Sequence, residues 1–315
     1  MAWGRLITGG LILGLVAGNG GAGAQEQTPP VAAFKSSIDM VRIAAVVRDS
    51  KGRFVQDLTK RDFEVLDNGQ TRPISDLQND LAGVSVAVLF DVSGSMEGHM
   101  PYAREAATHL LSWLNGYNDE AAVFTFDTHL DERAPFTTGL HTLPDSLTSV
   151  VPFGATSLHD AIALTARRVG EREGRRRAVV VLTDGNDNAS RLKPEDVSAI
   201  ASAIDVPVYI FGIVPSIDNP SAENSTHSVE SAAFAGPLAN LAAWTGGHVV
   251  VASTISQRSI AARQIIDELR HQYLIAFESS GKPGWHPLVV RARNKDLVVR
   301  ARSGYIAGQS RPTAH

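Results

Sequence analysis

The chain has 315 residues, a formal net charge of −4 at pH 7 and a hydrophobic fraction of 43%. Positive charge is neither in excess nor massed on one segment, which argues against nucleic acid as a partner. The hydrophobic fraction is typical of a globular protein with a packed core, and the length suits about two domains. The sequence has no cysteine, which excludes disulfides and cysteine-based metal or redox sites.

The first residues, 1–24, have the pattern of a secretory signal peptide. Arg5 supplies a positive charge, residues 6–16 are apolar and glycine-rich, and Ala22-Gly23-Ala24 offers small residues at a cleavage site. We expect cleavage after Ala24 and a secreted or periplasmic protein. The alternative, an uncleaved anchor, is disfavoured because a spanning helix needs about 20 apolar residues. No later run is long enough, so we expect no transmembrane segment after cleavage.

Residues 25–82 are expected to form an N-terminal β segment. Residues 38–48 predict a strand, and shorter strand-like runs follow between turn residues such as Asp67-Asn68-Gly69. A C-terminal β segment, 272–307, is expected to pack with it, before a tail at 308–315. In this second segment, the runs at 287–293 and 297–302 resemble the two strands of a hairpin.

Between these segments, residues 83–271 alternate strand and helix. Strands are predicted at 84–90, 121–126, 178–182, 206–213 and 248–251, and helices at 101–115, 158–169, 194–203, 238–244 and 257–271. The strands are continuous apolar runs, which is typical of parallel strands buried on both faces. We therefore predict an α/β fold, a doubly wound and mostly parallel sheet, inserted in a small β domain. Residues 127–155 predict a longer connection with mixed content, and the arginines of 172–177 a solvated loop.

The strand at 84–90 runs into Asp91-Val92-Ser93-Gly94-Ser95, for which three kinds of site compete. A phosphatase with an aspartate nucleophile needs a second aspartate two residues later, but Ser93 stands there, so the general acid is missing. A serine hydrolase of the α/β type needs G-x-S-x-G, which the residues around Ser95 do not match. One carboxylate and two hydroxyls on a tight loop suit a hard cation such as Mg²⁺, Mn²⁺ or Ca²⁺ rather than zinc.

Three oxygen ligands are too few for octahedral coordination, so other loops must contribute. Thr156 lies in a glycine turn just before a predicted helix, and Asp184 follows the strand at 178–182. In a doubly wound sheet, ligands bind outside the carboxyl ends of the strands. The predicted metal ligands are therefore Asp91, Ser93, Ser95, Thr156 and Asp184.

This set of motifs (D-x-S-x-S, a lone threonine before a helix, then T-D-G) resembles the metal-ion-dependent adhesion site of von Willebrand factor type A domains. The resemblance covers about Val84 to Arg270, and the flanks are similar to bacterial secreted proteins with a related domain. It implies that Ser93 and Ser95 bind the metal directly. It further implies that Thr156 binds directly or through water, and that Asp91 and Asp184 act mainly through water.

The resemblance implies a binding module rather than an enzyme. Mg²⁺, or Mn²⁺ or Ca²⁺ in its place, would keep one coordination position open for an Asp or Glu of a protein partner. His99 and His159 lie near the motifs and are expected to be surface histidines. Two alternatives stay open: a metal-dependent hydrolase that uses Asp91 or Ser95, and a structural envelope protein whose metal is only stabilising.

Overall fold

The computed structural model describes residues 40–79, 83–172, 175–203, 205–214 and 234–307. The predicted signal peptide (1–24), the start of the N-terminal β segment and the predicted tail (308–315) lie outside the described residues. Within the described ranges, no helix is long and apolar enough to cross a membrane.

A six-stranded sheet with the order β10-β9-β8-β5-β6-β7 forms the centre of the α/β part. All neighbours pair in parallel except β6 and β7. Every residue of β5, a central strand, is buried, which is why its sequence is a continuous apolar run. The strands are β5 (Val84–Asp91), β6 (Glu120–Phe126), β7 (Leu130–Thr138), β8 (Arg176–Thr183), β9 (Val208–Ile213) and β10 (Val249–Ala252).

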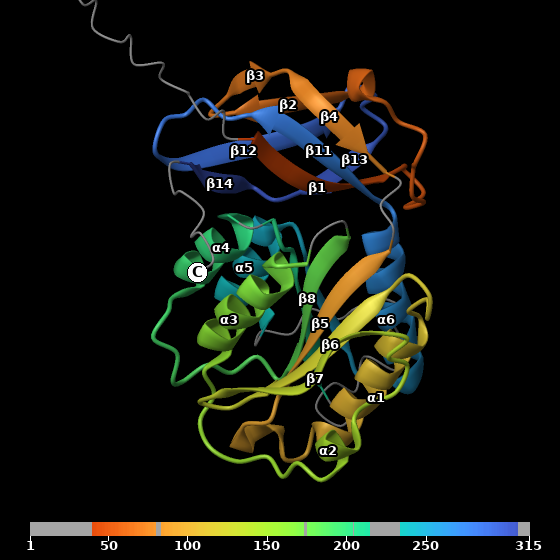
Figure 1. Ribbon diagram of the computed structural model, residues 1–315, viewed down its shortest axis with the longest axis vertical. Helices are drawn as coiled ribbons and strands as arrows, with labels where there is room; N and C mark the ends of the chain where they lie inside the picture. Colours follow the sequence, from red (N-terminus) through yellow and green to blue (C-terminus); the bar gives the residue numbers. More distant parts are fainter. Residues whose placement is uncertain (1–39, 80–82, 173–174, 204, 215–233, 308–315) are drawn as a thin grey trace, which may run out of the picture. The chain divides into compact units, whose positions relative to one another are not determined.

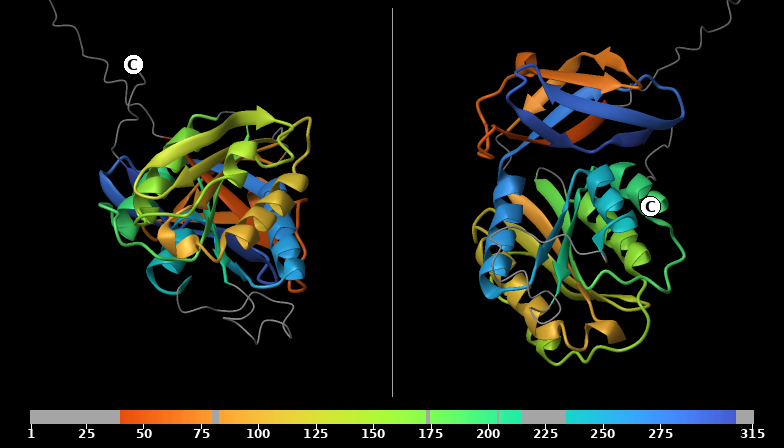
Figure 2. Two further views of the ribbon diagram at one scale, coloured as in Figure 1. Left: turned by 90° about the horizontal axis from the view of Figure 1, so that it is seen from below. Right: turned by 180° about the vertical axis from the view of Figure 1, so that it is seen from behind.

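Helices cover both faces of this sheet (Figures 1 and 2). Val86 and Val88 of β5 pack into the core with α1 and α6, whereas Ala87 and Leu89 pack into the core with α3, α4 and α5. This alternation is the period of two that a strand imposes on its side chains. The helices are α1 (Met100–Ser112), α3 (Leu158–Gly170), α4 (Pro194–Ala203), α5 (Pro237–Thr245) and α6 (Ile255–Arg270). The predicted fold class is confirmed.

The connection of mixed content predicted for residues 127–155 contains the edge strand β7 and the short helix α2 (Asp145–Thr148), neither of which the sequence located. β7 pairs antiparallel with β6, and none of its residues is fully buried. It also contains Pro135, which an edge strand tolerates because one side of its backbone needs no partner. An exposed strand of this kind lacks the apolar run by which the other strands are recognised.

Two four-stranded antiparallel sheets combine strands from before and after the α/β part (Figure 1). One has the order β13-β1-β11-β4 and the other β14-β12-β2-β3. Their strands are β1 (Met40–Arg48), β2 (Phe63–Asp67), β3 (Gln70–Arg72), β4 (Ile74–Gln78), β11 (Gln272–Glu278), β12 (Gly284–Ala292), β13 (Val298–Ala301) and β14 (Gly304–Ala307). The two sheets share one core, in which the rings of Phe63 and Tyr273 meet edge to face, 5.2 Å apart.

The hairpin predicted for the last strands is wrong. β12 pairs with β2 and β14, whereas β13 pairs with β1 in the other sheet. The alternating sequence identifies both runs as strands, but it carries no information on which strand each one pairs with. Here the turn after Ala292 carries the chain from one sheet to the other.

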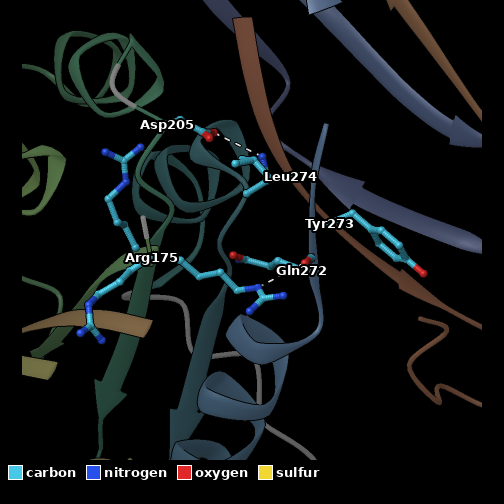
Figure 3. Close-up of a pocket in the computed structure, with 8 residues that line it drawn as sticks. Arg175, Asp205, Gln272, Tyr273 and Leu274 are labelled. Atoms are coloured by element: carbon cyan, nitrogen blue, oxygen red, sulfur yellow. Dashed lines mark hydrogen bonds between the residues drawn. The ribbon is translucent and has the colours of Figure 1, made fainter. Parts of the chain in front are cut away.

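The prediction that the arginines of 172–177 form a solvated loop is wrong for Arg176, which opens β8. Arg176 is buried, and its Nε donates to the carbonyl O of Gln272 at 3.3 Å. Arg172 donates two hydrogen bonds to the Glu120 carboxylate, at 2.7 and 2.8 Å. A cavity of about 30 Å³ beside this run is lined by Arg175, Asp205 and Gln272 among others, and it has room for about one water molecule (Figure 3).

Candidate metal centre

The loop that follows β5 holds a network of oxygen atoms. Ser93 Oγ donates to Asp91 Oδ1 at 2.6 Å, and the Ser93 backbone N–H donates to the same atom at 2.9 Å. Ser95 Oγ lies 3.2 Å from Ser93 Oγ. Asp91 and Ser93 are buried, whereas Ser95 is exposed. The loop therefore presents one buried carboxylate and a hydroxyl that solvent can reach.

A second loop, which leads to Thr156, is bound to the first by backbone hydrogen bonds. Phe153 N–H donates to the carbonyl O of Val92 at 2.9 Å, and Gly94 N–H donates to that of Gly154 at 3.0 Å. Gly154 has φ +84°, a left-handed conformation that favours glycine. These contacts hold Thr156 near the first loop, where it is buried.

The third loop begins where β8 ends, beside β5. Thr183, the last residue of β8, donates from Oγ1 to Asp91 Oδ2 at 2.7 Å. Asp184 follows it and is partly exposed. The charge of Asp184 acts on Asp91 and helps to raise the pKa of that carboxyl. The structure thus joins Asp91, Ser93 and Ser95 directly, and ties the loops of Thr156 and Asp184 to them.

Burial raises the pKa of Asp91 from 3.8 to about 6, although hydrogen bonds from Ser93 and Thr183 favour the charged form. Burial therefore destabilises the negative charge of Asp91, and a bound divalent cation would compensate that charge. The described residues contain no group of three or more His, Cys, Asp or Glu that could hold a metal. The donor set at this edge instead combines hydroxyls with carboxylates, which fits a hard cation.

Asn188 fixes the position of Thr156, and nothing in the motif pattern pointed to it. Asn188 Oδ1 accepts from the Thr156 backbone N–H at 2.8 Å. The backbone N–H groups of Asn188 and Ala189 both donate to the Thr156 carbonyl O, at 3.1 and 3.0 Å. The role of Thr183 was also missed, although its place in T-D-G at a strand end was a usable signal.

His159 is mostly buried, so its expected place on the surface is wrong. Its Nδ1 lies 2.7 Å from Asp187 Oδ2, and its backbone N–H donates to Asp187 Oδ2 and to Ser190 Oγ, each at 3.0 Å. These contacts fasten the start of α3 to the loop after β8. His99 is half-buried, with Nδ1 3.1 Å from the carbonyl O of Ser95.

The Asn188→Ala substitution is expected to weaken divalent-cation binding roughly fivefold, by about 1 kcal/mol, because it removes one hydrogen bond that orients Thr156. Titration calorimetry with Mg²⁺ measures this. Asn186→Ala is the matched control, because Asn186 is exposed and only its backbone N–H contacts Asp184. Equal affinities in the Asn188→Ala variant and the wild type would contradict a positioning role.

Residues 86–186 match the family model of the von Willebrand factor type A domain. No curated protein sequence matched the chain.

Three solved structures are similar at low identity. An aerotolerance-related membrane protein from Bacteroides fragilis is 20% identical over 59% of this chain and 98% of its own, with a TM-score of 0.47. A von Willebrand factor type A protein from Catenulispora acidiphila is 13% identical over 86% and 73%, with a TM-score of 0.46. The proximal thread matrix protein 1 of the mussel byssus, with a zinc-occupied MIDAS motif, is 18% identical over 65% and 50%, with a TM-score of 0.46.

The assignment rests on the sequence match and on the doubly wound fold. On these grounds, residues 86–186 belong to a von Willebrand factor type A domain.

Proposed function

We propose that this protein is an exported, divalent-metal-dependent binding module that captures an acidic residue of a protein partner. Von Willebrand factor type A domains often serve as metal-dependent adhesion or interaction modules. The observation that carries the proposal is the oxygen network of Asp91, Ser93 and Ser95, closed by the loops of Thr156 and Asp184. The proposed export rests on the signal-peptide pattern of residues 1–24.

The hydrogen bonds of the site favour cation binding by the serines. Ser93 Oγ gives its only proton to Asp91, so its lone pairs remain available to a cation. Ser95 is exposed, so a cation held there is open to a second molecule. We assign Ser93, Ser95 and Thr156 as direct ligands, with Asp91 and Asp184 balancing the charge. Bound Mg²⁺, or Mn²⁺ or Ca²⁺, would supply an open coordination position for a carboxylate.

Binding explains these residues better than catalysis does. Position 93 holds a serine hydroxyl, which cannot serve as the general acid or base that an aspartate nucleophile at position 91 would need. Of the two nearby histidines, His159 binds Asp187 through Nδ1, and His99 Nδ1 lies at hydrogen-bond distance from the Ser95 carbonyl O. A hydrolase and a purely stabilising metal remain the competing functions.

Titration of the wild-type protein with Mg²⁺ tests the proposal, with Ser95→Ala as the variant. We expect saturable binding by the wild type and a loss of about tenfold or more in affinity for the variant, because the variant lacks a ligand. No binding by the wild type, or equal binding by both, would overturn the proposed site. Metal-dependent ester or phosphate hydrolysis that Ser93→Ala abolishes would instead favour the hydrolase.

A further inference from the structure

The loop between α2 and Thr156 exposes two large apolar side chains beside the candidate metal centre. Val151 and Phe153 are each 80% exposed. Single exposed apolar residues are common on protein surfaces and need no explanation. Val151 and Phe153, however, lie two residues apart and precede the predicted ligand Thr156 by five and three residues. They therefore form a local apolar surface next to a site that is otherwise made of oxygen atoms.

Backbone contacts hold this loop in place on both sides of the two side chains. On one side, Arg104 of α1 donates from Nη2 to the carbonyl O atoms of Leu147 and Val150, each at 3.1 Å. On the other side, Phe153 N–H donates to Val92 O at 2.9 Å, next to Ser93. The exposed side chains are therefore held at a defined place relative to the oxygen network.

The two features together specify the chemistry of a partner. The oxygen network with its cation attracts a carboxylate, and the neighbouring side chains of Val151 and Phe153 gain free energy when an apolar group covers them. An extended peptide rises about 3.3 Å per residue, so one segment can contact both features with residues close in its sequence. Two side chains offer too little apolar area to anchor a membrane or a stable dimer by themselves.

We infer that Val151 and Phe153 are specificity-determining residues of the metal centre. They select an extended partner segment in which an apolar side chain lies two residues from the acidic residue, because alternate side chains of an extended segment face the same side. This inference rests on the proposed function, since it needs the metal to hold the acidic residue.

The test uses Mg²⁺-saturated protein and synthetic peptides, followed by NMR titration. The peptides Gly-Gly-Asp-Gly-Leu-Gly and Gly-Leu-Gly-Asp-Gly-Gly place leucine two residues after or before aspartate, on the same face of an extended chain. Gly-Gly-Asp-Gly-Ser-Gly lacks the apolar side chain. We expect the better leucine peptide to bind about tenfold more tightly than the serine peptide, as burial of one apolar side chain predicts. In Phe153→Ser, which keeps the backbone N–H that donates to Val92 O, this ratio should fall to about twofold or less.

Tyr117→Ser is the matched control, because Tyr117 is 92% exposed and precedes β6, whereas the metal centre lies where β5 and β8 end. This variant should keep the tenfold ratio. Failure of Mg²⁺ to bind the wild type would refute the proposed function. Equal binding of all peptides by Mg²⁺-saturated protein would refute this inference alone. Binding of none would contradict the proposed capture of an acidic residue as well. Self-association or binding to phosphatidylcholine vesicles that Phe153→Ser abolishes, without leucine selectivity, would also overturn it.

Discussion

Asp91→Asn is expected to weaken divalent-cation binding by about 100-fold or more and, at pH 7, to stabilise the metal-free protein by about 3 kcal/mol. Both effects have one cause, the charge of a buried carboxylate. Asn keeps an oxygen that can accept from Ser93, and the Thr183 hydroxyl can rotate to accept from the new amide. A lower cation affinity together with a higher stability of the metal-free protein is the result expected for a carboxylate whose role is to bind a cation.

The pH dependence follows from the pKa of Asp91, which is 3.8 in the reference state and about 6 in the folded protein. Between these values the folded state binds more protons, so the contribution of Asp91 to stability falls as pH rises from about 4 to about 6. Below pH 6, Mg²⁺ affinity should decrease by up to tenfold per pH unit, because the metal must displace the proton.

Urea denaturation in EDTA at pH 4.5 and 7, together with Mg²⁺ titration at the same pH values, measures both effects. Asp57→Asn is the control, because Asp57 is exposed, and this variant should follow the wild type. A metal-free Asp91→Asn protein that is less stable than the wild type at pH 7 would show that the carboxylate is structural.

Glu268→Gln is expected to destabilise the protein by about 2–3 kcal/mol, because it removes a buried negative charge that pairs with two arginines, each about one third exposed and partly screened by solvent. Glu268, in α6, is 1% exposed and accepts from Tyr209 of β9 at 2.8 Å. It forms ion pairs with Arg48 of β1, at 3.4 Å, and with Arg300 of β13. Without it, two arginines whose pKa values are lowered, mainly by burial, would lie together with no opposing charge.

The nearby His248 does not offset this loss. Burial, followed by the charges of Arg300 and Arg48, lowers the pKa of His248 to about 3, so the ring is neutral at pH 7. Urea denaturation at pH 7 measures the loss, with Glu278→Gln as control, since Glu278 is an exposed glutamate at the end of β11. A change of less than about 1 kcal/mol would mean that the cluster contributes no more than a surface ion pair.

Much of the fold could be predicted because the parallel strands can be recognised from their own sequences. The apolar runs of β5, β8 and β9 are buried on both faces, so their sequence reveals their environment. β7 carries no such run because it is an exposed edge strand. The order of Asp91, Thr156 and Asp184 could also be recognised in the sequence, since each lies just after a predicted strand or just before a predicted helix.

The sequence by itself determined the alternation of strands and helices, and the hydroxyls and carboxylates that would hold a metal. Both depend on local spacing. Tertiary structure alone decided that β13 pairs with β1 rather than β12, that Asn188 holds Thr156, and that Glu268 lies between two arginines. These contacts join segments far apart in the chain, and they depend on packing that no local pattern encodes. The order of the proposed ligands could therefore be recognised in the sequence, whereas the contacts that position them could not.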